Sequence, residues 1–285
     1  MAAKLLDGKT LAIKMKEGIK KDLALLKRVP SLVSIQLGDD PASVSYINSQ
    51  KKAAENLGIN YRLEKLDSGA SQDELIKVID RLNNDASVNG IIAQMPLPKK
   101  VDARAIAARI DPSKDIEAMN PKNMGELVFG GARILPCTAG ACMELLNSIE
   151  GLDLYGKQAV IIGHSEIVGK PLALLLLNKF ATTTVCHIAT GERGCLPEFV
   201  QKAEILIVAV GKPGIVKGEW IKQGAVVIDV GINRVNGKLV GDVEFDQAKE
   251  RASYITPVPG GVGPLTTAML MKNLLEAAKM QEKES

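Results

Sequence analysis

The feature that most constrains the fold is an alternation of short apolar stretches with helix-like stretches, which occurs twice along the chain. In the first block, residues 32–37 are expected to form a buried strand and residues 42–57 a helix. Residues 61–66 alternate as in a half-exposed strand, and Ser71 to Glu74 has the pattern of a capping box that begins a second helix. Residues 90–94 supply a third strand. Strands separated by helices predict a parallel sheet with right-handed crossovers.

The second block begins near Leu152 and repeats the pattern. Four apolar strands are expected, at residues 159–163, 183–187, 205–209 and 225–229. A helix at about 168–178 follows the first of them. Asn236-Gly237 then predicts a tight hairpin, because type I′ turns need two residues that tolerate positive φ. The sequence predicts two α/β lobes that face one another across a cleft, with no solenoid repeat and no low-complexity linker.

Composition excludes several classes of protein. A net charge of +3 with dispersed basic residues does not favour a nucleic-acid partner, and Lys20-Lys21 and Lys51-Lys52 are typical of solvated helix faces. No apolar run approaches the roughly 18 residues of a membrane helix, and residues 1–8 lack a signal-peptide core. Two histidines and four cysteines without CxxC spacing argue against a metal site and favour a reducing cytoplasm. The cysteines are Cys137, Cys142, Cys186 and Cys195.

A glycine turn at Gly163 to Gly169 lies where a phosphate-binding turn is expected, directly after a strand and before a helix. Such a turn lets the backbone approach a pyrophosphate, with helix N–H groups facing the anion. Ser165 replaces the usual second glycine and Gly169 comes one position late, so an ordinary structural turn is the alternative explanation of the motif. The three strands that follow favour dinucleotide binding. The second strand ends at His187-Ile188 and offers no carboxylate for the ribose of NAD.

Three further segments are more particular. Gly-Asp-Asp-Pro-Ala-Ser at 38–43 leads into a helix that carries Tyr46 and Gln50, and Gly90 to Pro98 forms a strand that ends in the amide of Gln94. Residues 256–266 combine prolines and glycines where regular structure cannot persist. Taken singly, these are explained as a helix face, a strand end and a rigid loop.

In this order, the segments resemble the methylenetetrahydrofolate dehydrogenase/cyclohydrolase family, from Leu6-Asp7-Gly8-Lys9 to the last helix. The resemblance implies a folate-binding domain at residues 1–120, completed by about 265–285, and a Rossmann-like NAD(P)-binding domain at 121–264. The final helix, about 265–280, would pack back on the first lobe. It also implies a cytoplasmic homodimer whose substrate is a tetrahydrofolate derivative.

The resemblance also assigns site residues. Tyr46 would stack on the folate ring system, and Gln94 would hydrogen-bond near the reacting centre. Pro259, Gly260 and Gly261 would line the cleft beside the nicotinamide. The dinucleotide contacts would be Gly163, His164, Ser165, Ile188 and Ile232.

The sequence departs from the family at Gln50, where relatives carry the lysine that acts as general acid and base in cyclohydrolysis. Tyr46 and Gln50 still share a helix face, but an amide cannot exchange a proton near neutral pH. Lys51 is displaced by about 100° around the helix, and Lys52 matches a second basic position of the family. We therefore expect a dehydrogenase whose cyclohydrolase activity is lost or reduced; the alternative is that another residue takes over.

Two more departures concern the ligands. The family's Lys-Asp-Val-Asp-Gly is Lys114-Asp115-Ile116-Glu117-Ala118 here, so Glu117 is expected to bind the pterin, with Asp115 as the alternative carboxylate. His164 and Ile188 replace residues that bind the 2′-phosphate in NADP-dependent relatives, which favours NAD over NADP. Lys170 and Arg193 could restore phosphate binding. The alternatives are a bifunctional NADP-dependent enzyme and a binding protein without turnover.

Overall fold

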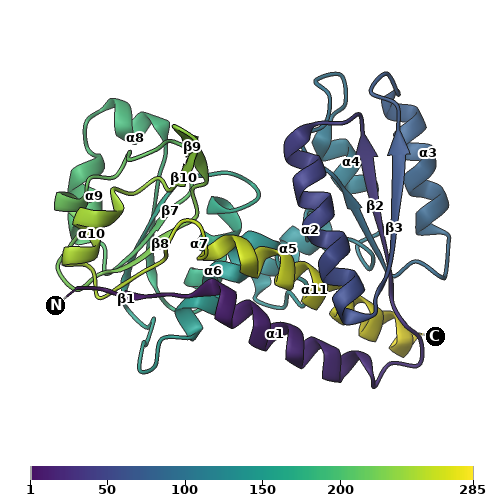
Figure 1. Cartoon of the computed structure of the whole chain (residues 1–285), viewed down its shortest axis with the longest axis horizontal. Coiled ribbons are helices and arrows are strands. Elements are labelled where there is room, and N and C mark those ends of the chain that lie inside the picture. The colour runs from purple at the N-terminus through teal and green to yellow at the C-terminus, as the bar shows by residue number, and fades with distance from the viewer. Residues whose placement is uncertain (1, 285) are drawn as a thin grey trace. The chain divides into compact units, whose positions relative to one another are not determined.

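The computed structural model describes residues 2–284, which divide into two compact units (Figure 1). Residues 2–13 and 138–266 form one, called here the six-stranded unit. Residues 14–137 and 267–284 form the other, the three-stranded unit. The chain is α/β throughout, as the sequence predicted.

The six-stranded unit is built on a sheet in which every neighbouring pair is parallel. Its strands, in spatial order, are β1 (Lys4–Leu5), β11 (Tyr254–Ile255), β8 (Val226–Asp229), β7 (Ile205–Val208), β5 (Gln158–Ile162) and β6 (Thr182–Cys186). The four strands of the second block are confirmed to within one or two residues, and the helix expected after the first is α7 (Gly169–Leu177). The sheet carries an apolar core that includes Val160, Leu206 and Val227.

Shorter elements complete this unit. They are α6 (Cys137–Asn147), α8 (Ile188–Glu192), α9 (Leu196–Lys202), the 3₁₀ turn η1 (Gly218–Trp220), the hairpin strands β9 (Asn233–Val235) and β10 (Lys238–Val240), and α10 (Phe245–Arg251). The expected hairpin is confirmed: Asn236 and Gly237 have φ of 49° and 78°, and Val235 pairs with Lys238. Positive φ at both turn residues is the geometry of a type I′ turn.

The three-stranded unit has a parallel sheet in the order β3 (Asn60–Leu66), β2 (Ser31–Leu37), β4 (Gly90–Ala93). Its helices are α1 (Gly8–Leu23), α2 (Pro41–Leu57), α3 (Gln72–Asn83), α4 (Ala103–Arg109), α5 (Pro121–Phe129) and α11 (Val262–Glu284), of which α1 and α11 begin in the other unit. The predicted capping box is present: Glu74 N donates to Ser71 Oγ, and Ser71 N donates to Glu74 Oε2.

The two faces of this sheet differ in chemistry. Val33 and Ile35 point to one face and pack with Leu75 and Ile79 of α3 in an apolar core. Ser34 lies on the opposite face, since side chains alternate along a strand, and α2 lies across that face (Figure 1). A buried polar residue such as Ser34 on this second face is unusual, because burying a polar group costs free energy unless it finds a hydrogen-bond partner.

The C-terminal helix α11 completes the three-stranded unit, as expected. Asn273 Nδ2 donates to Ile116 O at 2.8 Å and to Leu135 O at 2.7 Å. A Cβ at Gly90 would lie 2.6 Å from Leu274 Cδ1, so only glycine lets β4 approach the helix this closely.

The bounds of the two compact units differ from the expected domain boundaries at two places. Residues 121–137 belong to the three-stranded unit, whereas the expected boundary lay at residue 120. Residues 2–13 belong to the six-stranded unit, because β1 pairs with β11 through Lys4 and Tyr254. The resemblance gave no reason to separate the N-terminal strand from the residues that follow it.

Candidate active site

A buried amide pair lies between α2 and the polar face of the three-stranded sheet. Gln94, just after β4, donates from Nε2 to Ser34 Oγ at 2.7 Å and to Gln50 Oε1 at 2.8 Å. Gln50 is 0% exposed, and its own Nε2 has no hydrogen-bond partner among the described residues. Two sequence-predicted residues therefore meet here, and Ser34, which the sequence did not suggest, holds them. The free N–H groups of Gln50 suit a ligand that brings an acceptor.

Tyr46 and Glu117 belong to the same unit, and Glu117 affects the pKa of the Tyr46 phenol. Burial raises the pKa of Tyr46 well above its usual value, with Cys137 and Glu117 adding to the effect and the Gln50 side chain opposing it. Burial, followed by the charge of Asp115, raises the pKa of Glu117 from 4.5 to about 8. Among residues 2–284, no hydrogen bond reaches the Glu117 carboxyl group, so both of its oxygens remain for a ligand.

Asp115 is the alternative carboxylate, and its oxygens are already engaged. Oδ2 accepts from Asn120 N at 2.6 Å and from Asn123 Nδ2 at 3.0 Å, and Oδ1 accepts from Glu117 N at 3.3 Å. Burial raises the pKa of Asp115, and these donors oppose that rise. Asp115 thus shapes the turn that presents Glu117, and the geometry favours Glu117 as the ligand-binding carboxylate.

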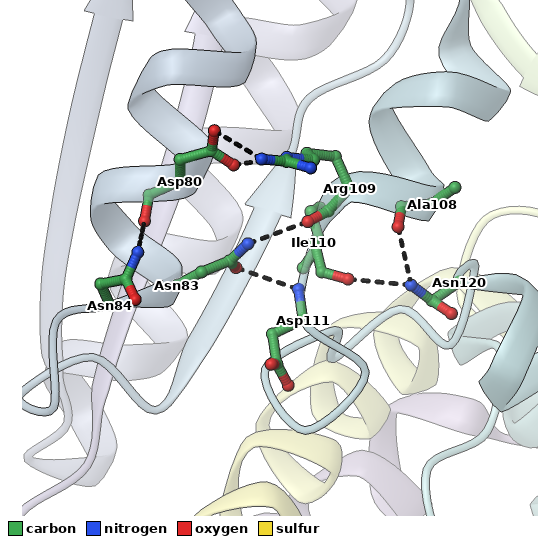
Figure 2. Close-up of polar contacts among 8 residues, drawn as sticks. All are labelled: Asp80, Asn83, Asn84, Ala108, Arg109, Ile110, Asp111 and Asn120. Atoms are coloured by element: carbon green, nitrogen blue, oxygen red, sulfur yellow. Dashed lines mark hydrogen bonds and ion pairs between the residues drawn. The ribbon is translucent and has the colours of Figure 1, made fainter.

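The acidic segment is fastened to the helices before it (Figure 2). Asn83 of α3 donates to Arg109 O at 2.8 Å and accepts from Asp111 N at 2.9 Å. Asn120 Nδ2 donates to Ile110 O at 2.9 Å, and Arg109 forms a two-point ion pair with Asp80. Both ends of the 111–120 segment are therefore fixed, which places Glu117 without relying on loop flexibility.

The lysines closest to these residues in sequence are directed elsewhere. Lys114 Nζ donates to Leu82 O, Asn83 O and Asp85 O at 2.8 to 3.0 Å, which satisfies carbonyls at the end of α3. Lys51 is exposed and lies 3.9 Å from Glu55, and Lys52 is exposed as well. Neither lysine next to Gln50 in sequence places an ammonium group beside the buried Gln50 side chain.

In the six-stranded unit, the expected dinucleotide residues gather at the carboxyl ends of the parallel strands. Gly163 directly follows β5, Ile188 follows β6, and Ile232 lies in the loop after β8. The carboxyl edge of a doubly wound sheet is where such folds bind ligands.

Gly163 and Gly169 are required by close backbone contacts. Gly163 has φ of 122°, and a Cβ there would lie 2.3 Å from Ala209 O. A Cβ on Gly169 would lie 2.0 Å from Gly163 O. Ser165 Oγ accepts from Val168 N at 3.2 Å, which closes the turn before α7. The turn thus has the close approach between strand and helix that a dinucleotide fold needs, although it departs from the usual glycine spacing.

Side chains around this turn are exposed. His164 and His187 are both exposed, with ring centroids 5.4 Å apart, and Ile188 and Ile232 are 76% and 61% exposed. Lys170 Nζ lies 3.4 Å from Glu166 Oε1, which partly neutralises it. An exposed isoleucine cannot donate to a phosphate, so the carboxyl end of β6 offers an apolar surface there.

The Pro259 to Gly261 loop follows β11 at the same edge. The Val258–Pro259 peptide bond is cis, as is Met95–Pro96 in the other unit. Gly260 has φ of 115°, and a Cβ on Gly8 would lie 1.7 Å from Gly261 O. The Leu-Asp-Gly-Lys motif at residues 6–9 thus packs directly on this loop, with Asp7 accepting from Lys9 N at 2.9 Å to begin α1.

Two buried carboxylates that sequence reasoning missed organise the loops of this edge. Asp242 accepts from Val210 N at 2.8 Å and Gly211 N at 2.9 Å, and Asp229 accepts from Gly231 N and Val243 N. Burial raises the pKa of Asp229 to about 6; the backbone N–H groups of Asp242 and Val243 oppose the rise, and the charge of Asp242 adds to it. The only sequence signal was the pair of glycines, Gly231 and Gly241, whose missing Cβ atoms make room for the carboxylates.

Within residues 2–284, no group of three or more His, Cys, Asp or Glu residues is placed to hold a metal ion. Nor does any helix in residues 2–284 have the length and apolar character needed to cross a membrane.

Comparison with known proteins gives matches along almost the whole chain. Residues 6–117 match the family model described as tetrahydrofolate dehydrogenase/cyclohydrolase, catalytic domain, and residues 136–282 match the corresponding NAD(P)-binding domain. The chain is 51% identical to "Bifunctional protein FolD" of Acetivibrio thermocellus, over 99% of both sequences.

Solved structures agree. The bifunctional FolD enzyme of Campylobacter jejuni has a TM-score of 0.94 at 44% identity, covering 98% of this chain and 99% of that one. The Trypanosoma brucei enzyme complexed with NADP has a TM-score of 0.93 at 39% identity, and the NAD-dependent dehydrogenase of Saccharomyces cerevisiae has 0.80 at 25%, each covering 99% of both chains.

Proposed function

The chain belongs to the tetrahydrofolate dehydrogenase/cyclohydrolase family, and we propose that it oxidises 5,10-methylenetetrahydrofolate to the 5,10-methenyl cation by hydride transfer to a nicotinamide dinucleotide. The hydride leaves the one-carbon unit with its electron pair and is accepted by the nicotinamide ring, so the step needs no proton transfer. What it requires from the protein is proximity and orientation.

The residues of the three-stranded unit supply that orientation. Tyr46 would stack on the reduced pterin, and Glu117 would accept hydrogen bonds from the pterin amino and amide groups. Gln50 and Gln94 would contact the folate beside the reacting carbon. In the six-stranded unit, Pro259, Gly260 and Gly261 would face the nicotinamide, and Gly163, His164, Ser165, Ile188 and Ile232 would contact the rest of the dinucleotide. The turn supports this role, because the lack of a Cβ at Gly163 and Gly169 lets the strand and the helix approach as closely as a dinucleotide fold requires.

We further propose that cyclohydrolase activity is lost or strongly reduced. The observation that carries this proposal is the burial of a neutral amide at position 50, with Lys51 and Lys52 exposed. Opening the methenyl ring requires water attack and proton transfers, to which a positioned base contributes about 10²- to 10⁴-fold. A neutral Gln50 also avoids repulsion of the cationic product.

The test is a paired assay of both activities on the wild type, Gln50→Lys and Lys51→Gln. Wild type should reduce the dinucleotide when given methylenetetrahydrofolate, but should not accelerate the decay of the methenyl compound. Gln50→Lys should gain hydrolysis by about 10²-fold or more, and Lys51→Gln should change neither activity. Hydrolysis by the wild type at a rate that matches dehydrogenation would contradict the proposal.

For the acceptor we propose NAD in preference to NADP. Ile188 is exposed at the carboxyl end of β6 and offers no donor to a 2′-phosphate, and His164 beside it is a poor anion partner when neutral. In His164→Arg combined with Ile188→Ser, one or two charge-assisted hydrogen bonds should shift the ratio of kcat/KM toward NADP by about 10- to 100-fold. A wild type that already prefers NADP would overturn this choice and favour the bifunctional NADP-dependent enzyme, with Lys170 or Arg193 as the phosphate ligand.

We also propose a homodimeric state and a cytoplasmic location, which the family resemblance implies. Light scattering of the purified chain at micromolar concentration tests the first of these, with twice the chain mass of 30.4 kDa expected.

A further inference from the structure

The polar face of the three-stranded sheet contains the hydroxyl group of Ser34, to which the proposed reaction assigns no role. Ser34 is 0% exposed and lies on β2, beneath α2. Its Oγ accepts one of the two N–H groups of Gln94, and Gln50 Oε1 accepts the other. Both hydrogens of the Gln94 amide nitrogen therefore point into the protein.

The direction of these bonds determines which atoms remain for a ligand. With its nitrogen engaged twice, Gln94 is left with Oε1, to which no hydrogen bond is made among the described residues. Gln50, whose oxygen is engaged, is left with Nε2, which is buried and has no partner. The pair thus offers one acceptor and one donor to whatever binds beside it.

A neighbour of Ser34 on the same face of the sheet agrees with the direction of the hydrogen bond from Gln94 to Ser34. Tyr61 lies on the same face of the sheet, because it is paired with Leu32, two residues before Ser34. Burial raises the pKa of the Tyr61 phenol and Ser34 opposes that rise. Tyr61 Oη is buried and has no hydrogen-bond partner among the described residues. Because Gln94 Nε2 donates to Ser34 Oγ, the hydroxyl proton of Ser34 points away from Gln94, and Ser34 presents a lone pair that keeps the amide nitrogen inward.

We propose that Ser34 is a positioning residue for hydride transfer: it holds the Gln94 amide with its oxygen toward the folate. This inference rests on the proposed dehydrogenase function. Loss of a hydride creates a positive charge on the one-carbon unit, and a preorganised carbonyl oxygen stabilises developing positive charge. An amide reversed end for end would direct its N–H groups at the cation and oppose the reaction.

The matched variants Ser34→Thr and Ser34→Val test this role, since threonine and valine have nearly the same shape and differ in the hydroxyl group. Any effect of the added bulk at a fully buried site is common to both. Ser34→Thr should keep kcat for NAD reduction about 2- to 10-fold above that of Ser34→Val, the effect of one hydrogen bond. KM for methylenetetrahydrofolate should differ less than twofold, because the oxygen acts on charge that develops only in the transition state.

A binding measurement supplies a second readout. Ser34→Val should bind the methenyl cation more weakly than Ser34→Thr, by a similar factor, whereas both should bind tetrahydrofolate, which lacks the cationic one-carbon bridge, equally well. If neither variant folds, Ser34→Cys and Ser34→Ala replace them, because a thiol retains a weak acceptor that alanine lacks.

Equal kcat and equal cation affinity in folded Thr and Val variants would overturn the inference. If the Thr and Val variants differed only in thermal stability, the inference would also be overturned, because the hydroxyl group would then serve the fold and not hydride transfer. Failure of the proposed function is recognised separately, because it requires that the wild type itself does not reduce NAD or NADP with methylenetetrahydrofolate.

Discussion

Replacing Glu117 with glutamine tests the electrostatics of the acidic segment, because the variant keeps the shape of the side chain and removes its titration. Burial and the neighbouring Asp115 raise the pKa of Glu117 from 4.5 to about 8. Between these two pH values the folded protein holds a proton that the unfolded chain has released. The free energy of unfolding therefore falls as the pH rises through this window. At about 1.4 kcal/mol per pH unit, the loss from pH 6 to pH 9 amounts to about 2 to 3 kcal/mol.

Urea unfolding of the wild type and Glu117→Gln at pH 6, 7.5 and 9 measures this contribution. The stability of the variant relative to the wild type should increase by about 2 to 3 kcal/mol over the range. Far-UV circular dichroism follows both units, whereas the single tryptophan, Trp220, reports on the six-stranded unit and should show no such difference. A stability difference that stays constant from pH 6 to pH 9 would refute the argument that Glu117 is protonated in the folded protein.

Ligand binding provides a second measurement of the same group. The pterin amino and amide groups donate hydrogen bonds, so folate binding should select the ionised form of Glu117. A carboxyl group whose pKa is about 8 is protonated in about nine molecules of ten at pH 7. Calorimetry in two buffers of different ionisation enthalpy should therefore detect the release of close to one proton per folate bound. Glu117→Gln should remove this release, and its persistence in the variant would assign the proton to another group.

Three other substitutions have outcomes set by single contacts. Gly169→Ala places a Cβ 2.0 Å from Gly163 O, so the turn must open, and we expect at least a tenfold rise in KM for the dinucleotide with KM for folate unchanged. Lys114→Met leaves the carbonyls of Leu82, Asn83 and Asp85 without their donor, and thermal unfolding should show a loss of about 2 to 4 kcal/mol. Asp242→Asn introduces N–H groups where the carboxylate accepts hydrogen bonds from three donors. Steady-state kinetics should therefore show a raised KM for the dinucleotide. An unchanged KM would mean that the loop after β7 does not depend on these bonds.

Much of the fold could be predicted because its signals are local. Strands such as β5 and β7 contain continuous apolar runs, and the Asn236-Gly237 turn and the Ser71 capping box depend on residues close together in sequence. The two-residue strands β1 and β11 could not be found in this way. Their pairing joins residues 4 and 254, and a stretch of two residues carries no periodicity.

The residues of the candidate site also fall into two groups, those that local sequence motifs indicate and those that depend on partners distant in sequence. Gln50 and Glu117 could be proposed from the sequence because they occupy recognisable motifs. Ser34 and Asp242 were not, since each acts through a partner far away in the sequence: Ser34 through Gln94, and Asp242 through the backbone of Val210 and Gly211. The choice between Asp115 and Glu117 also required the structure, because only the hydrogen-bond pattern shows which carboxylate is already occupied.

The pairing of β1 with β11 has a consequence for the order in which the protein can fold during synthesis. Lys4 leaves the ribosome 250 residues before its partner Tyr254, a delay of roughly 12 to 50 s at ordinary elongation rates. The three-stranded sheet of residues 31–93 can form in that interval, while the N-terminal strand has no edge to join. The first strand made is thus among the last to be placed, and an early nascent chain carries an unpaired segment that a chaperone could hold.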